Sequence, residues 1–186
     1  MQRYLPLVLI VGLLIAFRLI GCLPDAPQNF QPLAALFFCG ALLAPGWRGF
    51  AIPFAIWAVT YPFAKGPITD PAIILTTLMG LIVVFFIGKF FEKKSILKVL
   101  LGSVAASVVF HLITNGAAWI GDPMYQKNIT GLWQSVWTGP VGSPMPSWVF
   151  LKNFTAANLI FTSIFAVAQF RFTKPTVSVS VPLLAK

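Results

Sequence analysis

Residues that could bind or react are concentrated on one predicted helix, where three of them recur every four positions. His111, the only histidine of the chain, is followed by Asn115 and Trp119, so all three fall on one helix face. More polar side chains follow where the apolar run stops, namely Asp122, Tyr125 and Lys127. In apolar surroundings such a row needs a partner or a ligand. It predicts either a binding site or a row of hydrogen bonds between helices that only fixes packing.

The same residues offer little for catalysis or for a metal ion. The chain has one histidine, two cysteines and four acidic residues, and it shows no HExxH, CxxC or nucleophile-elbow motif. Cys22 and Cys39 are too isolated to indicate a disulfide framework, and we expect no metal and no cofactor. No GxxxxGK[ST] loop is present, so any ATP hydrolysis has to come from a partner. A membrane-bound enzyme that uses His111 is kept only as a third possibility.

Composition indicates an integral membrane protein. Of 186 residues, 58% are hydrophobic and 9% are charged, whereas soluble domains carry about 25% charged residues. The length suits a single domain over residues 1–186. The net charge of +9 points to lipid headgroups before nucleic acid, because no basic segment has the pattern of a groove-binding helix.

Six apolar segments predict an all-α fold, a polytopic bundle of six transmembrane helices. A spanning helix needs roughly 20 apolar residues. The second segment is short and indicates a tilted or half-length span, and Pro53 and Pro62 are expected to kink or end the third. Asp70 followed by Pro71 is typical of a helix start. The expected helices cover residues 5–21, 33–44, 49–64, 72–91, 96–120 and 150–170.

The first predicted helix has two features of its own. Gly12 and Ala16 are small residues four positions apart, which allows close approach of a partner helix. The end of the helix, Leu19 to Cys22, resembles a lipoprotein cleavage box, but Arg18 interrupts the apolar run just before it. We therefore expect an uncleaved transmembrane helix and keep the lipoprotein signal as the alternative.

The longest connection, between the fifth and sixth helices, contains a predicted amphipathic helix over residues 128–138. Its apolar residues recur at helical spacing along one stripe: Ile129, Leu132, Trp133, Val136 and Trp137. Asn128 suits the N-cap position. The two tryptophans suit a membrane interface, which is the commoner role, or the lid of a pocket. We take Trp133 and Trp137 as a candidate gate.

The distribution of charge predicts the orientation. With six spans both termini share one side, and nine of the 13 basic residues fall on it: Arg3, Arg48, Lys89, Lys93, Lys94, Lys98, Arg171, Lys174 and Lys186. Because loops rich in lysine and arginine stay in the cytoplasm, both termini are expected there. The row that begins at His111 and the predicted amphipathic helix then face outward.

Most side chains able to recognise a small molecule fall on that outward side. Aromatic walls with a few amides and single charges suit a small polar or aromatic ligand. The alternative is an aromatic belt with snorkelling cations, but a belt does not require an asparagine, a histidine and an aspartate in register. The predicted ligand-binding residues are Arg18, Asn29, His111, Asn115, Trp119, Asp122, Tyr125 and Asn158.

Several segments carry a resemblance to known proteins: Arg18, Pro27 to Leu36 (PQNFQPLAAL), Leu112 to Trp119 (LITNGAAW), Tyr125 to Leu132, and Lys152 with Asn153. Between about Phe17 and Phe165 the chain resembles a bacterial family of small six-helix membrane proteins, a domain of unknown function. That family is similar in turn to the substrate-binding S-components of energy-coupling-factor transporters. Asn158 stands where the family tends to have an acid.

The resemblance implies a membrane-embedded subunit with an outward pocket beneath the loop that joins the first two helices. It also implies a transmembrane coupling subunit and two ATPases as partners, with docking through Gly12 and Ala16. We therefore expect a subunit of the bacterial inner membrane that binds a small vitamin-like molecule for uptake. The alternative is a non-catalytic accessory subunit of a larger membrane complex, which the 18 phenylalanines would suit.

Overall fold

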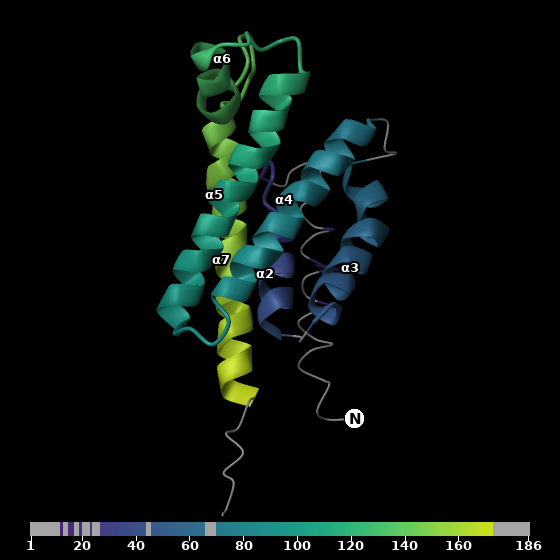
Figure 1. The fold of residues 1–186 in the computed structure, drawn as a ribbon, viewed down its shortest axis with the longest axis vertical. Helices are drawn as coiled ribbons and strands as arrows, with labels where there is room; N and C mark the ends of the chain where they lie inside the picture. Colours follow the sequence, from purple (N-terminus) through teal and green to yellow (C-terminus); the bar gives the residue numbers. More distant parts are fainter. Residues whose placement is uncertain are drawn as a thin grey trace, which may run out of the picture.

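A computed structural model describes residues 27–43, 46–65 and 70–172, together with the isolated positions 12, 15, 16, 19 and 23. Within this part of the chain the protein is all helical, as the sequence predicts (Figure 1). Six α-helices and one π-helical segment follow one another: α2 (Leu33–Leu43), α3 (Arg48–Lys65), α4 (Pro71–Phe90), α5 (Ile96–Gly121), α6 (Ile129–Trp133), η1 (Gln134–Thr138) and α7 (Ser147–Phe172).

Two helix starts follow from local capping chemistry. The Asp70 carboxylate accepts a hydrogen bond from the Ala72 backbone N–H at 2.8 Å, directly before α4. The Asn128 side chain accepts one from the Gly131 N–H at 2.9 Å, directly before α6. Each cap satisfies an N–H group that has no partner inside its own helix. Both predicted N-caps are therefore confirmed.

Among the residues that the structure describes, three helices are long and apolar enough to cross a membrane: Pro71–Phe90, Ile96–Gly121 and Ser147–Val167. By contrast, α2 has 11 residues and extends for about 16 Å, roughly half of a hydrocarbon core of ~30 Å. The sequence leaves a tilted and a half-length span open for this segment, and the length of α2 fits the half-length alternative. The third helix, α3, continues through both Pro53 and Pro62. These findings support a membrane protein, while a bundle of six spans stays a prediction.

The short helix α2 lies at the centre of the described helices. It packs against α3, α4, α5 and α7, and its residues from Leu33 to Ala41 are all buried. Gly88 of α4 makes part of this packing possible, since a Cβ atom there would lie 2.6 Å from the Phe38 carbonyl oxygen and 2.8 Å from the Ala41 Cβ. A half-helix enclosed in this way has its first turn inside the bundle, where water cannot satisfy its N–H groups.

The two longest helices, α5 and α7, pack against each other and extend together to one end of the molecule. Figure 1 shows α6 at that end, beside the C-terminal end of α5. The segment η1 contacts both α5 and α7. The fold therefore gathers the end of α5, the start of α7 and the α6–η1 segment in one place.

Several predictions for the N-terminal segment lie outside the described residues. They include most of the first span over residues 5–21, Arg18 and the greater part of the lipoprotein-like box. Gly12 and Ala16 are described, both helical and exposed, and nothing lies within 4 Å of a Cβ built on Gly12. The orientation of the two termini is likewise still a prediction.

Candidate functional site

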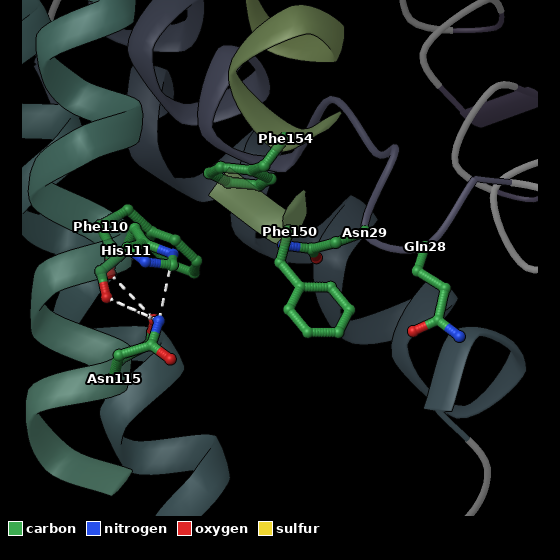
Figure 2. A pocket seen from close by; sticks show the side chains of 8 residues that line it. Gln28, Asn29, Phe110, His111, Asn115, Phe150 and Phe154 are labelled. Carbon is green, nitrogen blue, oxygen red and sulfur yellow. Dashed lines mark hydrogen bonds between the residues drawn. The ribbon is translucent and has the colours of Figure 1, made fainter. Parts of the chain in front are cut away.

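A cavity of about 260 Å³ opens between α5, α7 and the loop that precedes α2 (Figure 2). It brings together three of the predicted ligand-binding residues, Asn29, His111 and Asn115. The described residues that line it come from three segments that are far apart in the sequence: Gln28, Asn29, Phe110, His111, Thr114, Asn115, Phe150 and Phe154.

His111 and Asn115 are one helical turn apart on α5 and bond to each other. The Asn115 Nδ2 lies 3.1 Å from the His111 Nδ1 and also donates to the His111 backbone carbonyl at 2.9 Å. The opposite ring nitrogen, His111 Nε2, lies 2.8 Å from the Val136 carbonyl oxygen. Since a carbonyl only accepts, Nε2 carries the proton, and Nδ1 of the neutral ring is left to accept from Asn115. The network thus assigns the tautomer of the ring and the orientation of the amide.

The carbonyl that binds His111 is free because of the sequence that follows it. In an α-helix the Val136 oxygen would accept from the N–H of residue 140, but Pro140 has none. The chain instead forms a π turn, closed by a bond of 2.7 Å from the Gly139 N–H to the Gln134 oxygen, and then leaves the helix at Gly139 with φ +81°. An otherwise unpaired carbonyl of η1 is therefore satisfied by the histidine of α5.

A second bond ties η1 to the same turn of α5. The buried Ser135 hydroxyl donates to the Asn115 backbone carbonyl at 2.5 Å. This carbonyl lies on α5 one turn beyond His111, so the serine joins η1 to the part of α5 that also carries the histidine. Both residues that bond across, Ser135 and Val136, are neighbours on η1. The segment η1 is thus fixed directly behind the two cavity residues.

The loop before α2 reaches the cavity through a tight turn. Phe30 N–H donates to the Pro27 carbonyl at 3.0 Å, and Asn29 adopts φ +62°, a left-handed conformation that asparagine tolerates better than most residues. Its side-chain oxygen accepts from the Gln31 Nε2 at 3.0 Å. Asn153 of α7 holds the loop from the other side by donating to the Gln28 carbonyl at 3.0 Å. These bonds place the Asn29 side chain at the cavity.

Phenylalanine rings form the apolar walls. Phe110 of α5 and Phe154 of α7 stack with their centroids 5.1 Å apart and their planes at 28°. Figure 2 shows Phe150 projecting between these rings and the loop that carries Gln28. An aromatic or otherwise flat molecule could be held against such surfaces by dispersion and ring contacts.

The polar groups of the lining are uncharged, and some have no partner. None of the eight side chains that line the cavity within the described chain is acidic, lysine or arginine. The Asn115 Oδ1 and the Asn29 Nδ2 make no hydrogen bond within the described residues, whereas the other half of each amide is bonded. The cavity therefore offers one fixed acceptor and one fixed donor. No group of three metal-binding side chains occurs among the residues that the structure describes.

Three predicted site residues lie in a separate cluster around the α5–α6 connection. The Trp119 indole N–H donates to the Gln126 carbonyl at 2.9 Å, and Lys127 Nζ donates to the carbonyls of Trp119 and Asp122. The Asp122 carboxylate accepts from the Met124 N–H at 2.8 Å. A lysine on the last carbonyls of a helix is a C-terminal cap. Trp119, Asp122 and Tyr125 thus lie at the end of α5 and in the connection after it, and none of them is among the described residues that line the cavity.

Tyr125 in this cluster is buried although its backbone belongs to a connection. Burial raises the pKa of its phenol above the ordinary value, the Asp122 charge raises that pKa further, and a hydrogen bond with Ser135 lowers it. The phenol is consequently neutral at ordinary pH.

Asn158 also lies outside the lining, deeper between the helices. It is completely buried, its Oδ1 accepts from the Ala35 N–H at 2.6 Å, and its Nδ2 donates to the Phe154 carbonyl at 2.7 Å. Ala35 belongs to the first turn of α2, whose N–H groups lack partners within the helix. The Asn158 side chain therefore acts as a cap supplied by another helix.

The candidate gate residues are exposed and are not among the described residues that line the cavity. The Trp133 and Trp137 rings lie 5.9 Å apart, and their exposed fractions are 58% and 43%. What faces α5 is the polar side of the segment, through Ser135 and the Val136 carbonyl. A gating role for the two indoles stays a prediction, and they do not line the cavity described here.

Sequence reasoning missed five lining residues: Gln28, Phe110, Thr114, Phe150 and Phe154. The sequence did contain a pattern that marks the two lining residues on α7. Phe150, Phe154 and Asn158 recur every four residues on α7, with the spacing that singled out His111 and Asn115 on α5. The two rows face each other in the fold. Phenylalanine is so frequent in this chain that the row on α7 does not stand out.

Comparison with known proteins gives one result. No curated protein and no solved structure matches the chain. A family model described as a family of unknown function, DUF6580, matches residues 1–181, which is nearly the whole chain. The chain therefore belongs to this family.

Proposed function

We propose that this protein is a membrane-embedded binding subunit that holds a small uncharged molecule in the cavity between α5, α7 and the loop before α2. The observation that carries the proposal is an amide oxygen and an amide nitrogen, on Asn115 and Asn29, that are held in place yet unpaired at a cavity with aromatic walls. Ligand sites are usually formed before the ligand binds and place a few polar groups among apolar walls, so fixed groups without a partner suit recognition.

The size of the cavity limits the ligand. Pockets for drug-sized molecules measure roughly 300–1,000 Å³, and this cavity of about 260 Å³ is slightly smaller. It suits a single ring with a polar substituent. Phe110 and Phe154 would cover one face of such a ring. The absence of charge from the described part of the lining favours a neutral ligand over an anion or a cation.

Uptake is the wider role in which we place this binding. The resemblance to S-components of energy-coupling-factor transporters implies a coupling subunit in the membrane and two ATPases as partners. The chain has no phosphate-binding loop, so energy from ATP would have to come from such partners. Gly12 and Ala16, both exposed, are the residues we propose for docking the coupling subunit. The setting would be the bacterial inner membrane, with both termini in the cytoplasm.

Native mass spectrometry of the protein, extracted in mild detergent from the cells that make it, tests the binding role. We expect a small molecule to be retained by the wild type and lost from Asn115→Leu. Asn128→Leu makes the same exchange at the exposed α6 cap, so it should retain the molecule. A wild-type protein that retains no small molecule, under conditions in which bound lipid is still seen, would contradict the proposal.

A second candidate, an accessory subunit of a larger membrane complex, is favoured by one surface. Large apolar side chains on and after α6 are exposed: Ile129, Trp133, Trp137 and Val141, at 78%, 58%, 43% and 87%. A partner subunit could cover them. Stable co-purification with other subunits that is lost in the double variant Trp133→Gln and Trp137→Gln would favour this candidate. An intact monomer that retains a ligand would favour binding.

A further inference from the structure

We propose that Asn115 selects ligands that carry an N–H or O–H donor, and that His111 is the positioning residue that turns the Asn115 amide toward the ligand. The inference rests on the proposed function and names the class of ligand: a neutral ring with a carboxamide or a lactam, which offers both a donor and an acceptor. The hydrogen bonds that support it run from η1 through His111 to Asn115.

The first step fixes the histidine. Val136 presents a carbonyl oxygen 2.8 Å from His111 Nε2, and that oxygen has no helical donor because residue 140 is proline. A neutral imidazole has one donor and one acceptor, so a proton on Nε2 makes Nδ1 an acceptor. Ser135 keeps η1 in register by its bond to the Asn115 carbonyl. The tautomer of His111 is thus set from outside the cavity.

The second step fixes the amide. Asn115 Nδ2 has two acceptors within reach, His111 Nδ1 at 3.1 Å and the His111 carbonyl at 2.9 Å. Both are satisfied only when the amide nitrogen faces His111. Oδ1 then points away from the histidine, as Figure 2 shows, and it makes no bond within the described chain. The side chain can therefore accept from a ligand but has no N–H that points the same way.

The third step defines the complement on the other side of the cavity. Asn29 Oδ1 accepts from Gln31, which leaves the Asn29 Nδ2 as the unbonded half of that amide. Figure 2 shows this nitrogen on the side of Phe150. A ligand between the two asparagines would donate toward α5 and accept from the loop. A primary carboxamide or a lactam presents this pair of groups in one plane.

Three fragments with the same number of non-hydrogen atoms provide the test: benzamide, acetophenone and benzoate. Benzamide has an N–H donor, acetophenone replaces the NH₂ with a methyl group, and benzoate carries a charge. Binding is measured by ligand-observed NMR with the full-length protein in nanodiscs, and empty nanodiscs correct for partition into lipid. We expect benzamide to bind about 10-fold more tightly than acetophenone, because acetophenone leaves the Asn115 oxygen unpaired. Benzoate should bind more weakly than benzamide.

Variants assign the preference to the named residues. Asn115→Leu should reduce the ratio of benzamide to acetophenone affinity to about 1, and Asn128→Leu should leave it unchanged. His111→Gln can still donate to the Val136 carbonyl but removes the Nδ1 acceptor, so η1 should remain in place while the ratio falls. His111→Asn puts an amide close to the Nδ1 position and should restore part of the ratio. If His111 only stabilised the fold, these two variants would lower the thermal stability without changing the ratio of benzamide to acetophenone affinity.

Each contrary result has a distinct meaning. Equal affinities for benzamide and acetophenone in the wild type, or tighter binding of benzoate, would overturn the inference. So would a failure of all three fragments to bind to a protein that retains a native small molecule, and the proposed function would then still stand. If no native molecule is retained and no fragment binds, both the inference and the proposed function fail.

Discussion

Two polar clusters lie between α5 and α7, and they differ in whether their hydrogen-bonding groups are saturated. The buried seam consists of Ser103, Asn158 and Thr162. There Asn158 uses both ends of its amide, and the Ser103 and Thr162 hydroxyls lie 2.9 Å apart. In the cavity, the Asn115 amide is bonded through its nitrogen only, as far as the described part of the chain is concerned. Residues of the same type thus serve packing in one place and remain available for a ligand in the other.

The difference follows from what each amide faces. Asn158 faces the first turn of a half-length helix, whose N–H groups must be satisfied inside the protein. Asn115 faces a histidine on one side and open space on the other. Saturated polar groups specify how helices pack, and a fixed but unsaturated group can distinguish ligands. Four predictions test this difference between the two clusters.

Asn158→Leu should destabilise the protein by about 2–3 kcal/mol, because the buried Ala35 N–H would lose its partner. Reversible chemical unfolding in detergent measures the free energy. Ligand retention, scaled to the folded fraction, should be unchanged. If stability is instead retained and the ligand is lost, Asn158 belongs with the binding residues and the division into two clusters fails.

Gly88→Ala should destabilise the protein by about 1–3 kcal/mol, since the added Cβ would meet the Phe38 carbonyl and the Ala41 Cβ of α2. Gly116, next to Asn115, is the matched control because nothing lies within 4 Å of its added Cβ. Gly116→Ala should be neutral or stabilising by up to about 1 kcal/mol, as alanine favours a helix interior. Thermal unfolding of the two variants compares the packed centre with the open end. Equal effects would show that the cavity end is as tightly packed as the centre.

Much of the fold could be predicted from the sequence. The composition, the length of the apolar runs and the caps at Asp70 and Asn128 are local features of the sequence. Helices can be predicted well from such features. The short length of α2 could also be predicted, because its apolar run is too short for a full span. The π turn was not predicted. It depends on how Pro140 and Gly139 end the helix and on a partner from α5, and neither can be read from periodicity.

The site was harder to predict from the sequence than the fold was. The four-residue spacing on α5 identified His111 and Asn115 but also Trp119, which is bonded to the connection after the helix. Spacing shows that side chains share a face, but it does not show which of them already have partners. Asn158 illustrates the same limit, since its partner is a backbone N–H more than one hundred positions away. Only the assembled fold separates saturated from unsaturated groups.

Gly139→Ala should loosen η1 and lower the free energy of unfolding by about 1 kcal/mol. The reason is that φ +81° with ψ 169° is a conformation that only glycine adopts easily. Hydrogen exchange should be faster at the Gly139 amide, which bonds to the Gln134 carbonyl. Gly121→Ala, at the end of α5 with open space at its Cβ, is the control and should leave this amide protected. An unchanged rate of hydrogen exchange at this amide in Gly139→Ala would mean that η1 keeps its structure without the glycine turn. The support behind His111 would then not depend on this glycine.

The smallest expected effect concerns Tyr125, which the sequence places with the binding residues and the structure places with the cap of α5. Because burial raises its pKa in the folded protein, the neutral phenol favours folding. This stabilisation is complete below the pKa of the unfolded chain, about 10, and is lost as the pH rises through the higher folded value.

Unfolding free energies measured against pH should therefore fall above pH ~10 in the wild type and fall less in Tyr125→Phe. Below that pH, Tyr125→Phe should retain the ligand as well as the wild type does, since the phenol lies outside the cavity lining. Loss of the ligand at neutral pH in this variant would break the separation between the cap and the cavity. The tyrosine would then act on the ligand, directly or through its bond with Ser135, which also binds the Asn115 carbonyl.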